Sequence, residues 1–219
     1  MPKYLTGRKT KMWSMIISVI ITAGFANNFV FSQTYGICPF LGVSKQTPSA
    51  VGMGVAVTIV MVIATMITYP IYMLLVMLDI RFLEILVFIF VIAALVQMLE
   101  KIIKKVSPPL YNAMGIYLPL ITTNCAVLAV CEITSNALVS GTWEPALIAG
   151  VEMNFGFSVL YALAGGCGFM IAMVIMSGMR EKINHLNLPK ALQGFPITMV
   201  TAAFIAMAFY VFTMINLGG

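Results

Sequence analysis

The sequence predicts an all-helical integral membrane protein, and three observations lead to that prediction. Hydrophobic residues make up 61% of the chain and charged residues only 9%, whereas a soluble domain carries about 25% charged residues. Residues 50–78, 155–179 and 194–219 form long runs without any charge, as expected of spanning helices. These runs are continuous and lack the alternating pattern of a β-barrel. Because lipid offers the backbone no hydrogen-bond partners, helices are the remaining choice.

Six membrane spans are expected along the chain. The first begins near Trp13 and is interrupted from Asn27 onward, and the fourth begins near Tyr111 and ends at about Ile133. The basic N-terminus is interpreted as the flank of a span, because no small-residue site of the A-x-A kind follows it and further spans do. The other four spans are expected at about 50–76, 82–99, 155–178 and 194–216.

Basic residues in the links between spans predict the orientation, because cytoplasmic links carry an excess of Lys and Arg. The face that holds the links after spans one, three and five has seven basic residues, and the other face has five. We therefore expect both termini outside. The seven are Lys45, Lys101, Lys104, Lys105, Arg180, Lys182 and Lys190, and the five are Lys3, Arg8, Lys9, Lys11 and Arg81.

A weak internal repeat divides a single membrane domain, 1–219, into two halves. AVGMGVAVTIVMVI (50–63) is similar to LAGGCGFMIAMVIM (163–176), and in both a Gly-x-Gly pair precedes an apolar run. Since each half holds three spans, the halves must enter the membrane from opposite sides, which makes an inverted repeat of the kind found in many transporters. The expected repeats are about 13–106 and about 107–217.

The first span of each half contains residues that oppose a continuous helix. These segments read GFANNFVFSQTYGICPFLGVS (24–44) and YNAMGIYLPLITTNCAVLAVCEI (111–133). Proline lacks an N–H and clashes with the preceding turn, and unpaired Asn side chains are costly in hydrocarbon. Irregular backbone persists at membrane depth only inside protein or beside a cavity. Paired breaks therefore predict a buried binding site, and a cysteine lies at each break, Cys38 at the first and Cys125 at the second.

Two interpretations of Cys38 and Cys125 follow from the residues alone. They are small core residues, since free cysteine is often buried, or they are metal ligands, since thiolates select iron–sulfur clusters, zinc or copper(I). A cluster normally takes four thiolates, so this chain would supply half of a site. Cys131 lies about 240° around a helix from Cys125, and Cys167 lies in GGCG, where small residues favour close helix packing. Both are expected to be structural.

The sequence offers no catalytic residue. It contains no Walker loop, dinucleotide fingerprint, HExxH motif or CxxC motif. The lone His185 lies in the polar stretch REKINHLN and is expected to be a solvated loop residue. Basic residues cluster between the spans as topology signals, so nucleic acid is not an expected partner. Any flavin or nicotinamide chemistry is expected on other subunits.

Four stretches of the chain resemble a known family. NNFVFSQTYGICPFLGVSK (27–45), VIAALVQMLE (91–100), PPLYNAMGIYLPLITTNCAVL (108–128) and GMREKIN (178–184) are similar to the membrane subunits that include Rnf A, Rnf E, Nqr D and Nqr E. The resemblance covers nearly the whole chain, and the cysteine motifs are most similar to those of the Rnf A type. The chain departs from the family in its longer basic N-terminus and at 134–153.

The resemblance implies a subunit of a translocase, an ion-translocating (Na⁺ or H⁺) ferredoxin:NAD⁺ oxidoreductase, in a prokaryotic cytoplasmic membrane. It implies that Cys38 and Cys125 ligate one [2Fe–2S] cluster together with two cysteines of the homologous Rnf E protein, which has the opposite orientation. Electrons would cross the membrane through this cluster while ions move. The Rnf B, C, D and G subunits are further expected partners. Residues expected around the cluster are Gly36, Pro39, Gly42, Thr123 and Asn124.

Two alternatives stay open beside this interpretation. The first is the equivalent E subunit of Nqr, a Na⁺-translocating NADH:quinone oxidoreductase. The second is a redox-silent transporter or assembly subunit, in which the same inverted repeat is present and the cysteines only pack.

Overall fold

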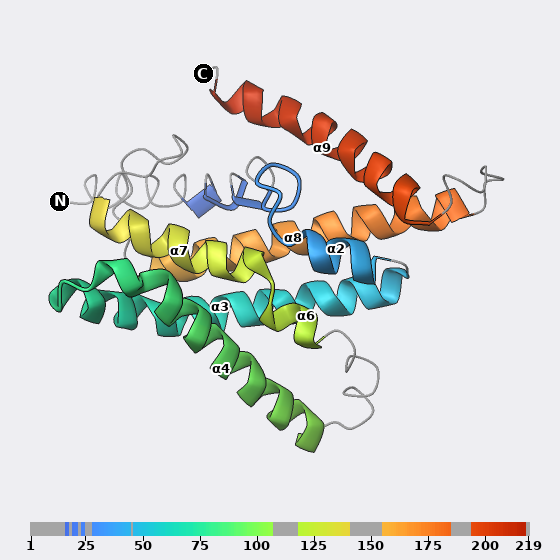
Figure 1. The fold of residues 1–219 in the computed structure, drawn as a ribbon. Coiled ribbons are helices and arrows are strands. Elements are labelled where there is room, and N and C mark those ends of the chain that lie inside the picture. The colour runs from blue at the N-terminus through green and yellow to red at the C-terminus, as the bar shows by residue number, and fades with distance from the viewer. Residues whose placement is uncertain are drawn as a thin grey trace, which may run out of the picture.

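All regular elements in the described part of the chain are helices, which confirms the all-helical prediction (Figure 1). The computed structural model describes residues 16–17, 19–21, 23–24, 28–44, 46–106, 118–140, 155–184 and 194–217. The helices are α2 (Ile37–Val43), α3 (Thr47–Met77), the 3₁₀ turn η2 (Arg81–Leu83), α4 (Glu84–Val106), α6 (Leu118–Thr122), α7 (Cys125–Ser140), α8 (Phe155–Asn184) and α9 (Phe195–Leu217).

Three helical stretches are long and apolar enough to cross a membrane, counted over the residues described. They are Thr47–Met77, Arg81–Ile102 and Phe155–Ile183, and the apolar stretch Phe195–Val211 is shorter. The three long stretches coincide with the predicted spans at 50–76, 82–99 and 155–178, and the shorter stretch coincides with the predicted span at 194–216. The first and fourth predicted spans differ: the described part of the first is interrupted before Gly36 and that of the fourth at Thr123 and Asn124, whereas Pro39 and Pro119 lie in the first turns of α2 and α6.

Two helices continue beyond the predicted ends of their spans. The apolar runs predict that the third span ends at residue 99 and the fifth at residue 178, yet α4 continues to Val106 and α8 to Asn184. Lys, Glu and Arg are good helix formers, so the charged sequences that follow the apolar runs extend the helices instead of ending them. Pro70 also lies inside α3 without ending it, as neighbouring helices allow in membrane proteins.

The α3–α8 pair forms the centre of the fold. These two helices make the most extensive contact of any pair, and α7 packs against α3. Glycines allow the close approach, since a Cβ atom on Gly54 would lie 2.7 Å from Cγ of Met170 and one on Gly166 would lie 2.9 Å from Cα of Thr58. In Figure 1, α4 and α9 leave opposite ends of this pair and diverge on opposite sides of it.

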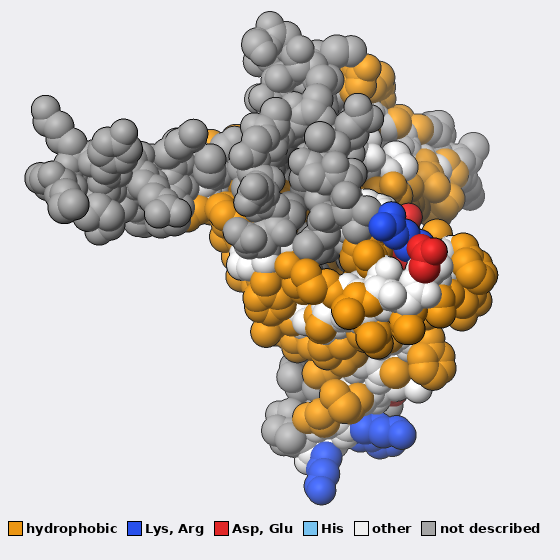
Figure 2. Space-filling view, turned by 90° about the vertical axis from the view of Figure 1, so that its left-hand side faces the viewer, with side chains coloured by type: hydrophobic (Ala, Val, Ile, Leu, Met, Phe, Trp, Pro, Cys, Tyr) orange, Lys and Arg blue, Asp and Glu red, His pale blue; other side chains and the backbone are white. Residues whose placement is uncertain are grey.

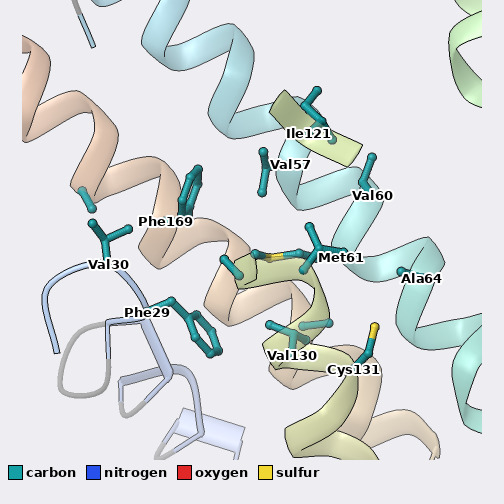
Figure 3. Packing of buried hydrophobic residues seen from close by; sticks show 14 of the residues in the cluster. Phe29, Val30, Val57, Val60, Met61, Ala64, Ile121, Val130, Cys131 and Phe169 are labelled. Carbon is teal, nitrogen blue, oxygen red and sulfur yellow. The ribbon is translucent and has the colours of Figure 1, made fainter. Parts of the chain in front are cut away.

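Apolar side chains fill the centre and also cover the outside. Phe29, Met61, Val130 and Phe169 pack together where the first broken segment, α3, α7 and α8 meet (Figure 3). Large apolar side chains also point outward, with Phe90 of α4 74% exposed and Phe204 of α9 65% exposed. In Figure 2 hydrophobic side chains cover much of the visible described surface, while Lys and Arg appear in two places, at the lower tip and on the right beside acidic side chains. Such a surface is suited to contact with lipid or with other membrane proteins.

We expect Gly168→Ala to destabilise the protein. A Cβ atom at this position of α8 would lie 2.5 Å from the carbonyl oxygen of Gly24, so backbone has to move. Overpacking of this kind costs about 1–3 kcal/mol, and the thermal unfolding midpoint of the purified complex should fall. Gly178→Ala is the matched control on the same helix, because its added Cβ meets nothing within 4 Å. Equal midpoints for the two variants would contradict the packing argument.

Candidate thiol site at the two broken segments

The first break is a compact turn held by one asparagine. The side-chain oxygen of Asn28 accepts a hydrogen bond from the N–H of Val30 at 3.0 Å, and its Nδ2 donates to the carbonyl oxygen of Gly168 in α8 at 2.9 Å. The turn ends at Gly36, whose φ of 76° lies in the left-handed region that glycine adopts most readily. Helix α2 begins at the next residue, so Cys38 lies in its first turn.

The second break also contains a turn that is closed by an asparagine side chain. Helix α6 ends at Thr122, and α7 begins at Cys125. Between them Asn124 is 3% exposed, and its Oδ1 accepts a hydrogen bond from the N–H of Ala126 at 3.1 Å. In both breaks the asparagine side chain therefore accepts a hydrogen bond from the backbone N–H two residues later, which forms the Asx turn that Asn adopts readily. Each break is followed by a helix that has a cysteine in its first turn.

The two breaks meet at Gly36 and Cys125. The N–H of Gly36 donates a hydrogen bond to Sγ of Cys125 at 2.9 Å, although the two residues are 89 positions apart. Cys38 is only two residues further along, so its Cα lies within about 7 Å of the Gly36 Cα. Both thiols are free and their residues are exposed. The structure thus brings the first cysteine-bearing turn against the second cysteine.

Gly36 occupies a space that no other residue fits. A Cβ atom there would lie 2.7 Å from Cε2 of Phe169, 3.1 Å from Oδ1 of Asn124 and 3.3 Å from Cβ of Ala126. The absence of a side chain at Gly36 therefore allows its N–H to reach the Cys125 sulfur. Phe169 supports this contact from α8, one residue after the carbonyl that binds Asn28.

A cavity of about 330 Å³ lies beside Cys125, between α4 and the second break. Thr123, Asn124 and Cys125 line one side of it, and the isoleucines Ile89 and Ile92 of α4 line another. The Nδ2 of Asn124 is buried and has no hydrogen-bond partner. A buried amide donor without a partner is costly. The second break therefore contains an unpaired hydrogen-bond donor in the residue next to Cys125.

The other residues predicted around the site lie on α2. Pro39 is buried and Gly42 is exposed. A Cβ atom on Gly42 would lie 3.4 Å from Cδ2 of Leu120 in α6, which places α2 next to α6. Of the predicted site residues, Gly36, Asn124 and Cys125 are therefore in direct contact, while Pro39 and Gly42 belong to the helix that carries Cys38.

Cys131 and Cys167 lie apart from this arrangement. Cys131 is fully buried in α7 and lies across from Ala64 of α3 (Figure 3). Cys167 is exposed on α8, while its neighbours Gly166 and Gly168 make the close helix contacts described above. Asn28 packs against α8 through its hydrogen bond to Gly168, and Asn27 lies outside the described residues.

The donor set at the breaks fits half of an iron–sulfur site. Two exposed thiols and a backbone N–H aimed at one sulfur are the groups that bind such a cluster and tune its potential. Within the part of the chain that the structure describes, no three His, Cys, Asp or Glu side chains gather as a ligand set. The described residues thus provide two thiolates, and a four-thiolate site needs two more from elsewhere.

Two residues that support the site could not be recognised from the sequence. Phe169 lies in a uniformly apolar run, where no signal distinguishes it. Arg180 reads only as a topology signal, yet its Nη1 donates hydrogen bonds to the carbonyl oxygen of Leu41 and to Oγ of Ser44. Its position at the end of an apolar helix, among other charged residues, gives no indication of these contacts.

Comparison with known proteins gives consistent matches over most of the chain. Residues 16–216 match the family described as Rnf-Nqr subunit, membrane protein. The A subunit of the Na⁺-translocating ferredoxin:NAD⁺ oxidoreductase complex of Acetobacterium woodii is 48% identical over 204 residues, covering 93% of this chain and 99% of the relative. The A subunit of an ion-translocating oxidoreductase complex is 43% identical in an Azoarcus species, covering 90% and 94% of the two chains, and 40% identical in Syntrophotalea carbinolica, covering 89% and 94%.

Proposed function

The chain belongs to the Rnf-Nqr family of membrane proteins, and on that basis we propose that it is the A subunit of an Rnf-type ion-translocating ferredoxin:NAD⁺ oxidoreductase. The relatives that are named as A subunits, matched along nearly their whole length, support the assignment. The relative whose name describes Na⁺ translocation is 48% identical, and the ion carried here is Na⁺ or H⁺. The proposed location is a prokaryotic cytoplasmic membrane, with several crossings and both termini outside.

The observation that carries the proposal is the hydrogen bond from the Gly36 N–H to Sγ of Cys125. It joins the two cysteine-bearing breaks, so Cys38 and Cys125 are suited to act as two ligands of one [2Fe–2S] cluster. The homologous Rnf E protein supplies the other two thiolates in this proposal. When bound, the cluster supplies a one-electron carrier at membrane depth. In this proposal the residues of this chain supply two thiolates, and the Gly36 N–H donates to one of the two sulfurs.

The arrangement of the helices supports a six-span inverted repeat, about 13–106 and about 107–217. Each proposed half has a broken first span with an Asx turn, then a long central helix, then a diverging third helix (Figure 1). The start of α3 and the ends of α4 and α8 lie toward the same side in Figure 1. Lys101, Lys104, Lys105 and Arg180 belong to these ends, which favours that side as the cytoplasmic one.

In this proposal the Rnf B, C, D and G subunits are the remaining partners, and flavins reside on other subunits. This chain has no complete active site of its own. In this proposal the change of charge that accompanies reduction of the cluster would bias the two breaks and so couple electron transfer to ion movement, because both breaks contact the Cys125 sulfur. The equivalent Nqr protein is the nearest alternative, and the names of the curated relatives favour the Rnf assignment.

A double variant tests the proposal against the redox-silent alternative. We expect Cys38→Ala/Cys125→Ala, expressed in a strain lacking the native chain, to abolish ferredoxin-driven NAD⁺ reduction by membranes, because this chain then offers no thiolate at the breaks. The amount of assembled complex, measured by native electrophoresis, should stay near wild type. A redox-silent subunit would retain the activity, and that result would refute an electron-carrying role for this chain.

A further inference from the structure

Helix α2 is too short to hold its own position. It has seven residues, so most of its backbone N–H and C=O groups belong to the four at each end that find no partner within a helix. It nevertheless carries Cys38, whose placement decides whether Cys38 and Cys125 can ligate the same cluster. At its N-terminal end the Gly36 N–H binds the Cys125 sulfur. Its buried side chains Pro39, Phe40 and Val43 pack it against the rest of the fold. The contacts at its C-terminal end contribute further to how firmly Cys38 is placed.

The guanidinium of Arg180 binds that C-terminal end. Its Nη1 donates to the carbonyl oxygen of Leu41 at 2.8 Å and to Oγ of Ser44 at 2.9 Å. The last four carbonyls of a helix lack a partner within the helix, and a positive charge there is favourable. Ser44 is fully buried, so its hydroxyl also requires a partner. One charged side chain satisfies both groups.

The neighbours of Arg180 on α8 bind Thr47, the first residue of α3, which follows α2 in the chain. Oγ of Ser177 donates to Oγ1 of Thr47 at 3.3 Å, and Oγ1 of Thr47 donates to Oε2 of Glu181 at 3.0 Å. Arg180 and Glu181 lie three and four positions after Ser177, so the three residues share one face of α8. That face holds the end of α2 and the start of α3 together, on a helix whose Gly168 also binds the first break.

From these contacts we propose that Arg180 is a positioning residue for Cys38. It fixes the C-terminal end of α2 to α8 and thereby sets the distance between the Cys38 and Cys125 thiols. The inference rests on the proposed function insofar as that distance matters to a shared cluster. The attachment of α2 to Arg180 does not depend on the cluster and can be measured separately.

The test compares Arg180→Gln, Arg180→Lys and Lys182→Gln in the purified complex. Lys182 is exposed and lies two residues after Arg180 on α8, so its variant removes the same charge without removing a hydrogen bond to α2. Loss of hydrogen bonds to a charged group should make the amides of α2 exchange with deuterium about tenfold faster in Arg180→Gln. The amides of α7 should exchange as in wild type, Arg180→Lys should be intermediate, and Lys182→Gln should match wild type.

Electron paramagnetic resonance (EPR) of the reduced complex then separates positioning from support of the fold. Arg180→Gln should shift the g values or the midpoint potential of the signal that depends on Cys38, while Lys182→Gln should not. Unchanged α2 exchange in Arg180→Gln overturns the inference, as does faster exchange with an unchanged signal. If Cys38→Ser leaves the signal intact, the proposed function fails instead, and the exchange comparison alone decides whether Arg180 holds α2.

Discussion

Replacing Cys38 or Cys125 singly with serine should remove the [2Fe–2S] EPR signal to which this chain contributes, and ferredoxin:NAD⁺ oxidoreductase activity with it. A cluster of this type needs four thiolate ligands, and a serine hydroxyl at one position is a harder, weaker ligand for iron. The effect should be as large for Cys125 as for Cys38, because in the proposed arrangement both ligate the same cluster. Each variant complex is purified anaerobically and reduced before the spectrum is recorded.

Cys131→Ser and Cys167→Ser are the matched controls within the same chain. Cys131 is buried against α3 and Cys167 is exposed on α8, and neither takes part in the contact between the breaks. Both variants should therefore retain the signal and the activity. Loss of the signal in either control would mean that the ligand set has to be revised. Retention of every cluster signal in both Cys38→Ser and Cys125→Ser would refute the assignment of these two cysteines as ligands.

Gly36→Ala should have the next largest effect. A non-glycine residue in the left-handed region costs about 1–2 kcal/mol, and the new Cβ would press on Phe169 and on Asn124, which adds about 1–3 kcal/mol of overpacking. The first break then has to move away from Cys125, so the Gly36 N–H no longer reaches its sulfur. We expect a lower thermal midpoint of the complex and a weakened or shifted EPR signal.

Gly52→Ala provides the control for this prediction. Gly52 lies in α3, where an added Cβ meets nothing within 4 Å, and alanine is favoured over glycine inside a helix by about 1 kcal/mol. Its midpoint should be equal to or above that of wild type, with the same spectrum. If Gly36→Ala behaves like Gly52→Ala, the close contact between the breaks is not required.

The long helices and the location of the breaks could be predicted because they depend on local sequence. Uncharged runs longer than a membrane span identify α3 and α8. Gly36 and Asn124 favour turns over helix, so both interruptions are visible in the sequence, whereas Pro39 lies in the first turn of α2, where proline is tolerated. The ends of α4 and α8 could not be predicted in the same way, because charged residues that favour links between spans are also good helix formers.

The contacts that build the site could not be predicted because they join residues distant in sequence. Nothing near Gly36 indicates that its N–H binds the sulfur of Cys125, and nothing near Arg180 indicates that it holds the end of α2. The end of α3 at Asp79 is a local feature that also could not be predicted from the sequence. It adopts a positive φ of 56° where α3 ends, and the N–H of Ile80 bonds to the carbonyl of Leu75. A glycine is the usual residue in such a Schellman motif, so the turn carries no clear signal.

The central claim is that one thiolate from each break belongs to one shared cluster. The most direct measurement is the iron content per complex of wild type and of Cys38→Ala/Cys125→Ala, each purified anaerobically and normalised to the amount of protein. Loss of one [2Fe–2S] cluster predicts a difference of about two iron atoms per complex, with all other clusters retained. Equal iron content in the two complexes would contradict the claim.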